Sequence, residues 1–345
     1  MDPYLELVES ARLETQFRRD GTVHTYHESG KHASQRRLHR EETWQYQKTI
    51  GQGAYGSVWL EKCATEQEIK VRAVKMIREF EPDRPSESTG RDFTRELGAV
   101  TKFSHPKYEP CFVKSFGWYE NPEAIFIAME YLNHGDLQTY LNQIPRLSEP
   151  EGREITFQIL EGLHCMHQNE FAHRDLKPGN ILIRSMPPDN WWIKLCDFGI
   201  SKNLADDFTK STVKGTLAYM APELLEKVDS VKERNSRNNQ AADMWALGEI
   251  VVRMLTGEPT FTSPLMLLKY VERSPPLPLE RLEELQITDE ACLFVRSLMK
   301  VPPEERLTSQ EALRQNWMSI YESPVLEMPG SNALRHVTCS NILFV

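Results

Sequence analysis

Three residues that together could transfer a phosphoryl group lie within six positions of one another, in the sequence His-Arg-Asp-Leu-Lys-Pro-Gly-Asn at 173–180. Asp175 offers a carboxylate that can orient a hydroxyl acceptor and accept its proton, Lys177 offers a cation, and Asn180 offers an oxygen ligand for a metal ion. A second carboxylate, Asp197, follows in the sequence Asp-Phe-Gly and can chelate Mg²⁺. An isolated Asp-Phe-Gly is common by chance, but the two segments in this order predict phosphoryl transfer.

A glycine-rich turn at residues 51–58 could supply further phosphate contacts. Gly51, Gly53 and Gly56 would let backbone amides approach a polyphosphate, because glycine has no Cβ to stand in the way. The same glycine spacing marks dinucleotide-binding folds, and glycines often do no more than make a turn. Here the turn is followed by a predicted strand and not by a helix, which disfavours the dinucleotide alternative.

Lys75 lies between apolar residues of a strand predicted at 71–77. A lysine in this position could simply extend its charged end into water. A lysine that contacts a nucleotide needs a carboxylate partner, and Glu96, in a helix predicted at 93–103, is well placed to supply it. The pair would hold Lys75 against the α- and β-phosphates.

Two kinds of structure must position these residues. Strands are predicted at 44–50, 58–60, 71–77, 113–119 and 124–129, so the first third of the chain is a small β-rich unit. The remainder is mainly helical. Ser148 and Glu151 form a capping box ahead of one long helix, and the apolar stretch 242–255, followed by Gly257, predicts a buried helix.

Composition restricts the class of protein. The chain has 345 residues, 40% of them hydrophobic, which is enough for one large core or two packed lobes. A net charge of −9 argues against nucleic-acid binding, and six scattered cysteines without a CxxC pair predict neither a disulfide framework nor a zinc site. With no apolar run that suits a signal peptide or a membrane span, we expect a cytoplasmic and/or nuclear protein without membrane attachment.

Taken in order, these motifs resemble those of the eukaryotic serine/threonine protein kinases, over residues 44–321. Ala-Pro-Glu at 221–223, Asp-Met-Trp-Ala-Leu-Gly at 243–248 and Arg306 extend the match, and the late stretch 287–317 is similar to calmodulin-dependent and checkpoint-type kinases. The resemblance implies an α+β, bilobal protein-kinase fold, with a small β-rich N-lobe at 44–130 and a larger, mainly helical C-lobe at 133–321. A flexible arm at 1–43 and a tail at 322–345 would flank it.

The resemblance also implies ATP and Mg²⁺ as cofactors and assigns roles to residues. Asp175, Lys177 and Asn180 would be catalytic, and Asn180 and Asp197 would ligate the metal. Glu223 should pair with Arg306, and Asp243 should brace the backbone of the catalytic loop. The residues expected to bind the nucleotide, each of which could equally be plain core, are Ile50, Gly51, Gly53, Gly56, Val58, Ala73, Lys75, Glu96, Met129, Glu130, Leu132 and Leu182.

The acceptor and the control of the enzyme are implied in the same way. Lys177 and Thr216 resemble the serine/threonine class. Arg174 is typical of kinases that are switched by phosphorylation of the activation segment, where Thr212 occupies the usual site and Lys202 is a second cation. A phosphothreonine would add about two negative charges facing Arg174 and Lys202. Alternatively, these residues form a plain polar loop.

Protein substrates and an upstream kinase are the partners that this interpretation suggests, and the oligomeric state stays open. Two alternatives remain. A pseudokinase scaffold would keep the fold and lose the chemistry, but it normally lacks one of the motif residues, all of which are present here. A module could instead bind partners through the basic residues between Arg12 and Arg40, but acidic residues in the same segment reduce its net positive charge.

Overall fold

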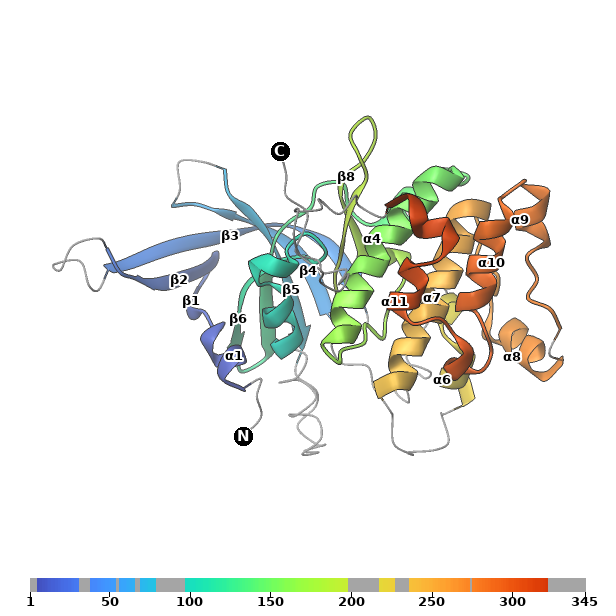
Figure 1. The fold of residues 1–345 in the computed structure, drawn as a ribbon. Helices are drawn as coiled ribbons and strands as arrows, with labels where there is room; N and C mark the ends of the chain where they lie inside the picture. The colour runs from blue at the N-terminus through green and yellow to red at the C-terminus, as the bar shows by residue number, and fades with distance from the viewer. Residues whose placement is uncertain are drawn as a thin grey trace, which may run out of the picture. The chain divides into compact units, whose positions relative to one another are not determined.

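The computed structural model describes residues 5–30, 38–53, 56–65, 69–78, 97–197, 217–226, 236–273 and 275–321. The chain divides into two compact units (Figure 1). The first contains residues 1–109 and 113–132, and the second contains residues 110–112 and 133–345. Strands dominate the first unit and helices dominate the second.

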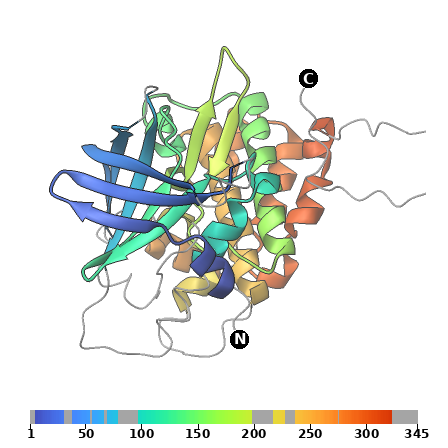
Figure 2. The same cartoon turned by 90° about the vertical axis from the view of Figure 1, so that its left-hand side faces the viewer.

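The first unit is built on a seven-stranded sheet in the order β1-β2-β3-β4-β5-β7-β6. Every neighbouring pair is antiparallel. Figure 2 shows this sheet from the side, with the N-terminal strands in dark blue. Residues 97–103 are helical and belong to the same unit. The element bounds are α1 (Leu5–Ser10), β1 (Glu14–Arg18), β2 (Gly21–Glu28), β3 (Leu38–Gly53), β4 (Gly56–Cys63), β5 (Val71–Arg78), η2 (Pro106–Tyr108), β6 (Ser115–Asn121) and β7 (Ala124–Met129).

The prediction of a flexible arm at residues 1–43 is wrong for the described part of that segment. Residues 5–10 form α1, and β1 and β2 form a hairpin that pairs with the long strand β3. The segment lacks clear apolar alternation because its buried positions include Thr22 and His24, which are hydrogen-bonded to each other and, for His24, also to Thr15 and Arg72. Because Arg18 pairs with Gly21, Arg19 and Asp20 are the two turn residues of the hairpin.

The segment that precedes β1 joins the far edge of the sheet. Leu13 N donates to Trp118 O at 2.7 Å, and Trp118 N donates to Ala11 O at 3.1 Å. The indole Nε1 of Trp118 also donates to Val8 O at 2.8 Å. Trp118 lies in β6, the edge strand on that side, so these bonds form an isolated bridge between the segment before β1 and the far edge of the sheet. The bridge pairs the backbone groups of Trp118, which an open edge would leave unpaired.

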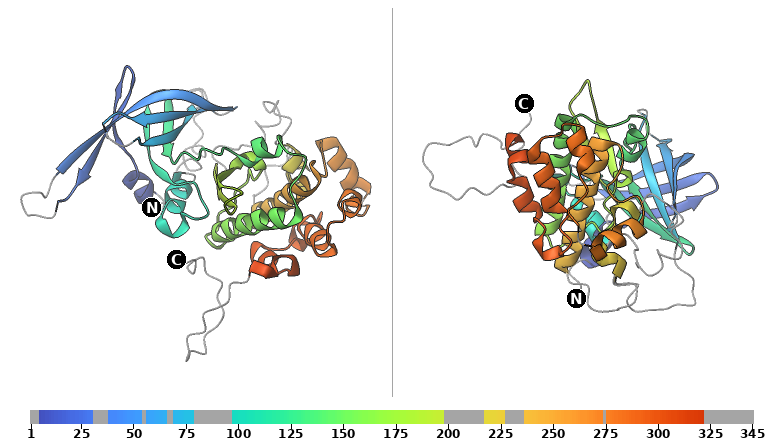
Figure 3. Two further views of the ribbon diagram at one scale, coloured as in Figure 1. Left: turned by 90° about the horizontal axis from the view of Figure 1, so that it is seen from above. Right: turned by 90° about the vertical axis from the view of Figure 1, so that its right-hand side faces the viewer.

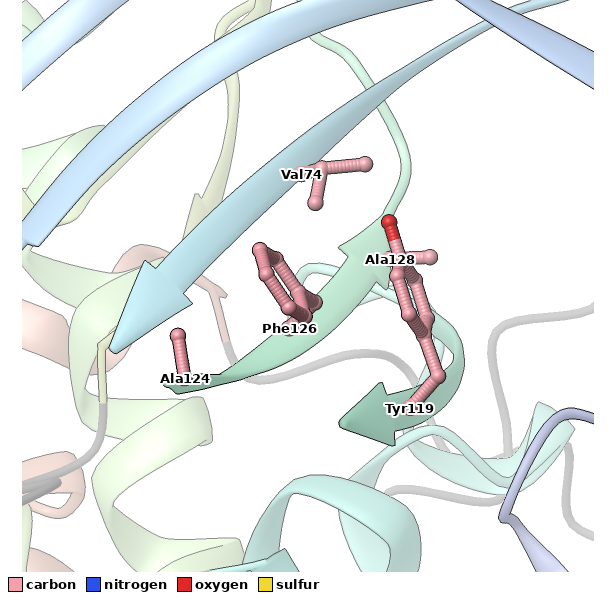
Figure 4. Close-up of a cluster of buried hydrophobic side chains, with 5 residues drawn as sticks. All are labelled: Val74, Tyr119, Ala124, Phe126 and Ala128. Atoms are coloured by element: carbon pink, nitrogen blue, oxygen red, sulfur yellow. The ribbon is translucent and has the colours of Figure 1, made fainter. Parts of the chain in front are cut away.

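One side of the sheet encloses a compact apolar cluster of Val74, Tyr119, Ala124, Phe126 and Ala128 (Figure 4). The rings of Tyr119 and Phe126 are stacked, with their centroids 5.0 Å apart. Phe17 of β1 lies against both rings, at 5.8 and 5.7 Å. Phe17 itself is 45% exposed, whereas the buried ring of His24 in β2 contacts Tyr119 at 4.9 Å, so the N-terminal hairpin covers this cluster.

The second unit is mainly helical, as predicted (Figure 3). The capping box is present, with Ser148 N donating to Glu151 Oε2 at 3.0 Å. The buried helix α7 begins at Ser236, earlier than predicted, and Gly257 follows its last residue with φ +91°. The bounds are α3 (Leu137–Leu141), α4 (Glu149–Gln168), η3 (Pro178–Asn180), β8 (Ile181–Ser185), β9 (Trp192–Leu195), η4 (Leu217–Tyr219), α6 (Pro222–Glu226), α7 (Ser236–Thr256), α8 (Pro264–Arg273), α9 (Glu280–Glu284), α10 (Asp289–Leu298), η6 (Pro303–Glu305), α11 (Ser309–Leu313) and η7 (Asn316–Tyr321). Among the described residues, no helix combines the length and the apolar character needed to cross a membrane.

The hairpin provides a direct test of whether residues 5–43 belong to the folded unit. A Cβ added to Gly21 would lie 1.9 Å from Trp44 O, which is backbone and cannot move aside cheaply. We expect Gly21→Ala to lower the free energy of unfolding by about 2 kcal/mol, measured by urea denaturation. Arg19→Ala, in the exposed turn of the same hairpin, should change it little. Equal stability of the two variants would show that the hairpin does not contribute.

Candidate active site

The three predicted catalytic residues form one hydrogen-bonded cluster in the second unit. Lys177 Nζ lies 2.9 Å from Asp175 Oδ2. Asn180 donates through Nδ2 both to Asp175 O at 2.7 Å and to Asp175 Oδ2 at 3.0 Å. The short helix η3 places Asn180 within reach, because Asn180 N closes its turn on Lys177 O. The carboxylate of Asp175 is therefore held by a cation and an amide.

Asp243 of α7 fixes the backbone of this loop, as expected. Its buried carboxylate accepts from His173 N and Arg174 N, each at 2.8 Å. Oδ2 also accepts from His167 Nε2 at 3.0 Å, and His167 must be the donor because a carboxylate has no proton to give. Arg174 has a φ of 65°, a backbone conformation that a non-glycine residue adopts only at a cost. The three bonds to Asp243 stabilise that conformation.

The predicted metal ligands meet at one end of the β8–β9 ribbon. Ile181 pairs with Leu195, so Asn180 directly precedes the ribbon and Asp197 closely follows it. Cys196 N donates to Asn180 O at 3.0 Å, which joins the two segments. Because the side-chain nitrogen of Asn180 bonds to Asp175, its Oδ1 is the atom suited to a cation.

These donors fit a magnesium ion. Mg²⁺ is usually held by one or two carboxylates, together with water and phosphate oxygens. Asp197 and Asn180 provide one carboxylate and one amide oxygen. In the part of the chain that the structure describes, no group of three or more His, Cys, Asp or Glu residues is arranged for a metal ion. The donor set therefore suits a cation that is shared with phosphates, and not a cage made by the protein alone.

In the first unit, strand pairing places Lys75 among the predicted nucleotide-binding residues. Val58 pairs with Lys75, Gly51 pairs with Val58, and Ala73 pairs with Met129. Paired residues share a face of the sheet, and residues two apart along a strand share it as well. Gly51, Val58, Ala73, Lys75 and Met129 therefore lie on one face.

The turn and the segment after β7 have their own constraints. A Cβ on Gly56 would lie 1.8 Å from Met76 O, so this position requires glycine. The side chain of Ile50, at the turn, is 39% exposed. The side chain of Glu130 accepts a hydrogen bond through Oε1 from the backbone amide of Lys114, at 2.7 Å. Leu132 is the last residue of the first unit.

The remaining predicted residues divide between described and undescribed parts of the chain. Leu182 is half-buried in β8, within the second unit. Gly53 is the last residue of β3. Glu96, Lys202, Thr212 and Thr216 lie outside the described residues, so the Lys75–Glu96 pair and the activation-segment site stay predictions.

A buried ion pair secures the segment after the activation loop. Arg306 donates to both carboxylate oxygens of Glu223, at 2.8 and 2.7 Å, as expected. Its other N–H groups donate to the backbone oxygens of Lys300, Ala241 and Val301. Every guanidinium donor is thus used, which is what a buried charge requires.

The interaction that sequence reasoning missed is the bond from His167 to Asp243. His167 is near the end of α4, and its carbonyl accepts from Gln240 of α7 at 3.1 Å. His167 and Asp243 are 76 residues apart, and no sequence motif connects them. Sequence spacing alone does not show that α4 and α7 are adjacent, so this contact needed the fold.

A strand lysine in one unit and a braced Asp-Lys-Asn loop in the other are the hallmarks of a protein kinase domain. A model of this family, described as the protein kinase domain, matches residues 44–318, and the chain belongs to that family. Residues 5–43, including the N-terminal hairpin, precede the matched region.

Known relatives refine the class. The serine/threonine-protein kinase RAD53 of Saccharomyces cerevisiae is 34% identical over 79% of this chain, and cds1 of Schizosaccharomyces pombe is 28% identical over 88%. The matches span 32% of RAD53 and 65% of cds1, so the chain covers only part of these proteins' lengths. A crystal structure of Rad53 1-466 in complex with AMP-PNP has a TM-score of 0.63, at 32% identity, covering 80% of this chain and 65% of the other. These relatives confirm the resemblance to checkpoint-type serine/threonine kinases.

The Glu223–Arg306 pair leads to a stability prediction. Lysine cannot bind a carboxylate in the bidentate manner and has fewer donors, so Arg306→Lys leaves buried oxygens without partners. We expect a loss of about 3 kcal/mol in the free energy of unfolding, measured by chemical denaturation. Arg296→Lys is the matched control, since Arg296 pairs with exposed Glu283 at 3.4 Å and should lose less than about 0.5 kcal/mol. Similar losses in both variants would contradict the assignment.

Proposed function

We propose that this chain is an active serine/threonine kinase that uses ATP and Mg²⁺ to phosphorylate protein substrates. The observation that carries the proposal is the Asp175–Lys177–Asn180 cluster, held by Asp243. The relative crystallised with AMP-PNP, an ATP analogue, supports ATP as the nucleotide. Lys177 and Thr216 support serine and threonine as the acceptors.

Each residue of the cluster has one task in this mechanism. Asp175 orients the acceptor hydroxyl and takes its proton, while Lys177 stabilises the negative charge on the transferred phosphate. Asn180 and Asp197 would hold Mg²⁺, which supplies charge neutralisation at the phosphate oxygens when it is bound. In the first unit, Lys75, supported by Glu96, would contact the α- and β-phosphates.

The predicted nucleotide-binding residues complete the proposal. Backbone amides between Gly51 and Gly56 would approach the phosphates, and Val58, Ala73 and Leu182 would enclose the base. Met129, Glu130 and Leu132 would lie beside the adenine. The face shared by Val58, Ala73, Lys75 and Met129 supports this assignment.

The two alternatives are weaker. A pseudokinase scaffold would not need the full set of motif residues, and Asp175, Lys177 and Asn180 are hydrogen-bonded together. A module with a basic N-terminal arm would need free cations. In the described part of that segment, two of the cations are already paired, since Arg12 pairs with Glu120 at 2.6 Å and Arg40 pairs with Glu42, while Arg18 and Arg19 are exposed.

A single carboxylate-to-amide change tests the activity. Asp175→Asn keeps the size of the side chain but removes the proton acceptor, so transfer of labelled phosphate from ATP to a generic protein should fall by about a hundredfold or more. Binding of Mg·ATP should persist. Asp189→Asn, in the exposed turn after β8, is the control and should retain full transfer. Equal transfer by the Asp175 and Asp189 variants would reject the proposed function, and label found on tyrosine would reject the acceptor class.

We propose, in addition, that phosphorylation of Thr212 controls the enzyme. Arg174 is exposed and directly precedes the catalytic Asp175, which suits a phosphate-binding cation. Lys202 would be the second cation, and either an upstream kinase or another copy of the chain would add the phosphate. Phosphorylation would order the segment through these charge pairs.

Thr212→Ala measures this control. The kcat of this variant should be at least about tenfold lower than that of the phosphorylated wild type, because the variant lacks the phosphate charge that orders the segment. Its unfolding transition should be unchanged. Thr209→Ala, in the same segment, should behave as the wild type. Phosphatase treatment should lower the activity of the wild type and leave the Thr212 variant as it is; equal activity of the wild type and Thr212→Ala would reject the control.

A further inference from the structure

The side of the sheet that faces away from Lys75 contains a buried ion pair. Arg72 of β5 donates to Glu61 Oε2 through Nη2 at 2.6 Å and through Nε at 2.8 Å. Arg72 is 1% exposed and Glu61 is 3% exposed. The two residues are direct cross-strand partners, so the pair also connects β4 to β5. A buried pair of this kind is costly unless its remaining donors are satisfied.

The N-terminal hairpin supplies part of that satisfaction. His24 of β2 lies 2.7 Å from Arg72, between Nε2 and Nη2. A guanidinium can only donate, so Nε2 must accept and the imidazole is neutral. Its Nδ1 then carries the proton and donates to Thr15 Oγ1 of β1 at 2.8 Å. Burial, followed by the nearby charge of Arg72, lowers the pKa of His24 to about 3, in agreement with the neutral form.

This network fixes the register of the strand that carries Lys75. Arg72 and Lys75 are three residues apart on β5, so their side chains point to opposite faces. Arg72 pairs with Glu61 and Lys75 pairs with Val58 of the same strand β4. A slip of β5 by one residue would turn the side chain of Lys75 to the buried face and take Arg72 away from Glu61 and His24. Because both results leave a charge buried without a partner, the network opposes the slip.

We propose that His24, in the segment that precedes the matched kinase domain, is a positioning residue for Lys75. By accepting from Arg72, His24 holds β5 in the register that presents Lys75 to the nucleotide. The N-terminal hairpin is thereby part of the nucleotide-binding unit of this kinase. This inference rests on the proposed role of Lys75 in ATP binding.

Substitutions at His24 in the full-length chain test this role. His24→Leu removes the acceptor, and we expect the Kd and the KM for Mg·ATP to rise about tenfold while kcat changes less than twofold. His24→Gln offers an amide oxygen to Arg72 and should restore most of the binding. His27→Leu is the matched control on the same strand, since His27 is exposed and bonds to Glu14, and it should bind as the wild type.

A purely structural role would have a different outcome. If His24→Leu lowers the melting temperature but keeps the Kd and KM of the wild type, or if kcat falls while the Kd and KM stay unchanged, the proposal is overturned. If His24→Leu does not fold, Thr15→Val decides, because it removes the partner of Nδ1, together with a local bond to Leu13 O, and should raise the Kd in the same direction by a smaller factor. An unchanged Kd for a folded Thr15→Val would overturn the proposal.

A direct measurement of Mg·ATP binding distinguishes failure of the positioning role of His24 from failure of the proposed kinase activity. A wild-type chain that binds Mg·ATP without transferring phosphate would reject the kinase activity. In that case the Kd values of the His24 and His27 variants still test the positioning role. A wild-type chain that binds no Mg·ATP would overturn both.

Discussion

The catalytic loop depends on the hydrogen bonds that its backbone donates to the carboxylate of Asp243. This carboxylate is buried in α7 and accepts from two consecutive backbone amides, those of His173 and Arg174, and from the ring of His167. The left-handed backbone of Arg174 costs about 1–3 kcal/mol on its own. A buried carboxylate without donors would cost more, so the loop and the carboxylate stabilise each other. Asp175 follows directly and takes its position from this arrangement.

The same physical logic operates in both units. In each, a buried charge is hydrogen-bonded close to a chemically active group: Asp243 near Asp175, and Arg72, through Nε and Nη2, near Lys75. Arg72 Nη1 is buried without a hydrogen-bond partner. Buried charges tolerate few alternative arrangements, because each alternative leaves donors or acceptors unpaired. They therefore provide specificity of position more than net stability. The Arg306–Glu223 pair follows the same pattern, with all its donors used.

Sequence reasoning was successful where chemistry and spacing are local. The Asp175–Lys177–Asn180 loop, the capping box of α4 and the buried character of α7 depend on neighbours a few residues apart, and the structure contains all three. The N-terminal segment was misjudged for the opposite reason. The partner of His24 is Arg72, 48 residues away, and apolar periodicity does not reveal a strand whose buried positions include the polar residues Thr22 and His24.

The pairing of β2 with β3 and the bridge to β6 explain why the first unit includes that segment. Without residues 5–37, β3 would lose its partner β2, and β6 would lose its bonds to Ala11 and Leu13. Two sheet edges would then present unpaired backbone groups, and Phe17 would no longer cover Tyr119 and Phe126. Arg72 would keep Glu61 but lose His24. The family match begins at residue 44, but the physical unit that carries Lys75 already begins with α1.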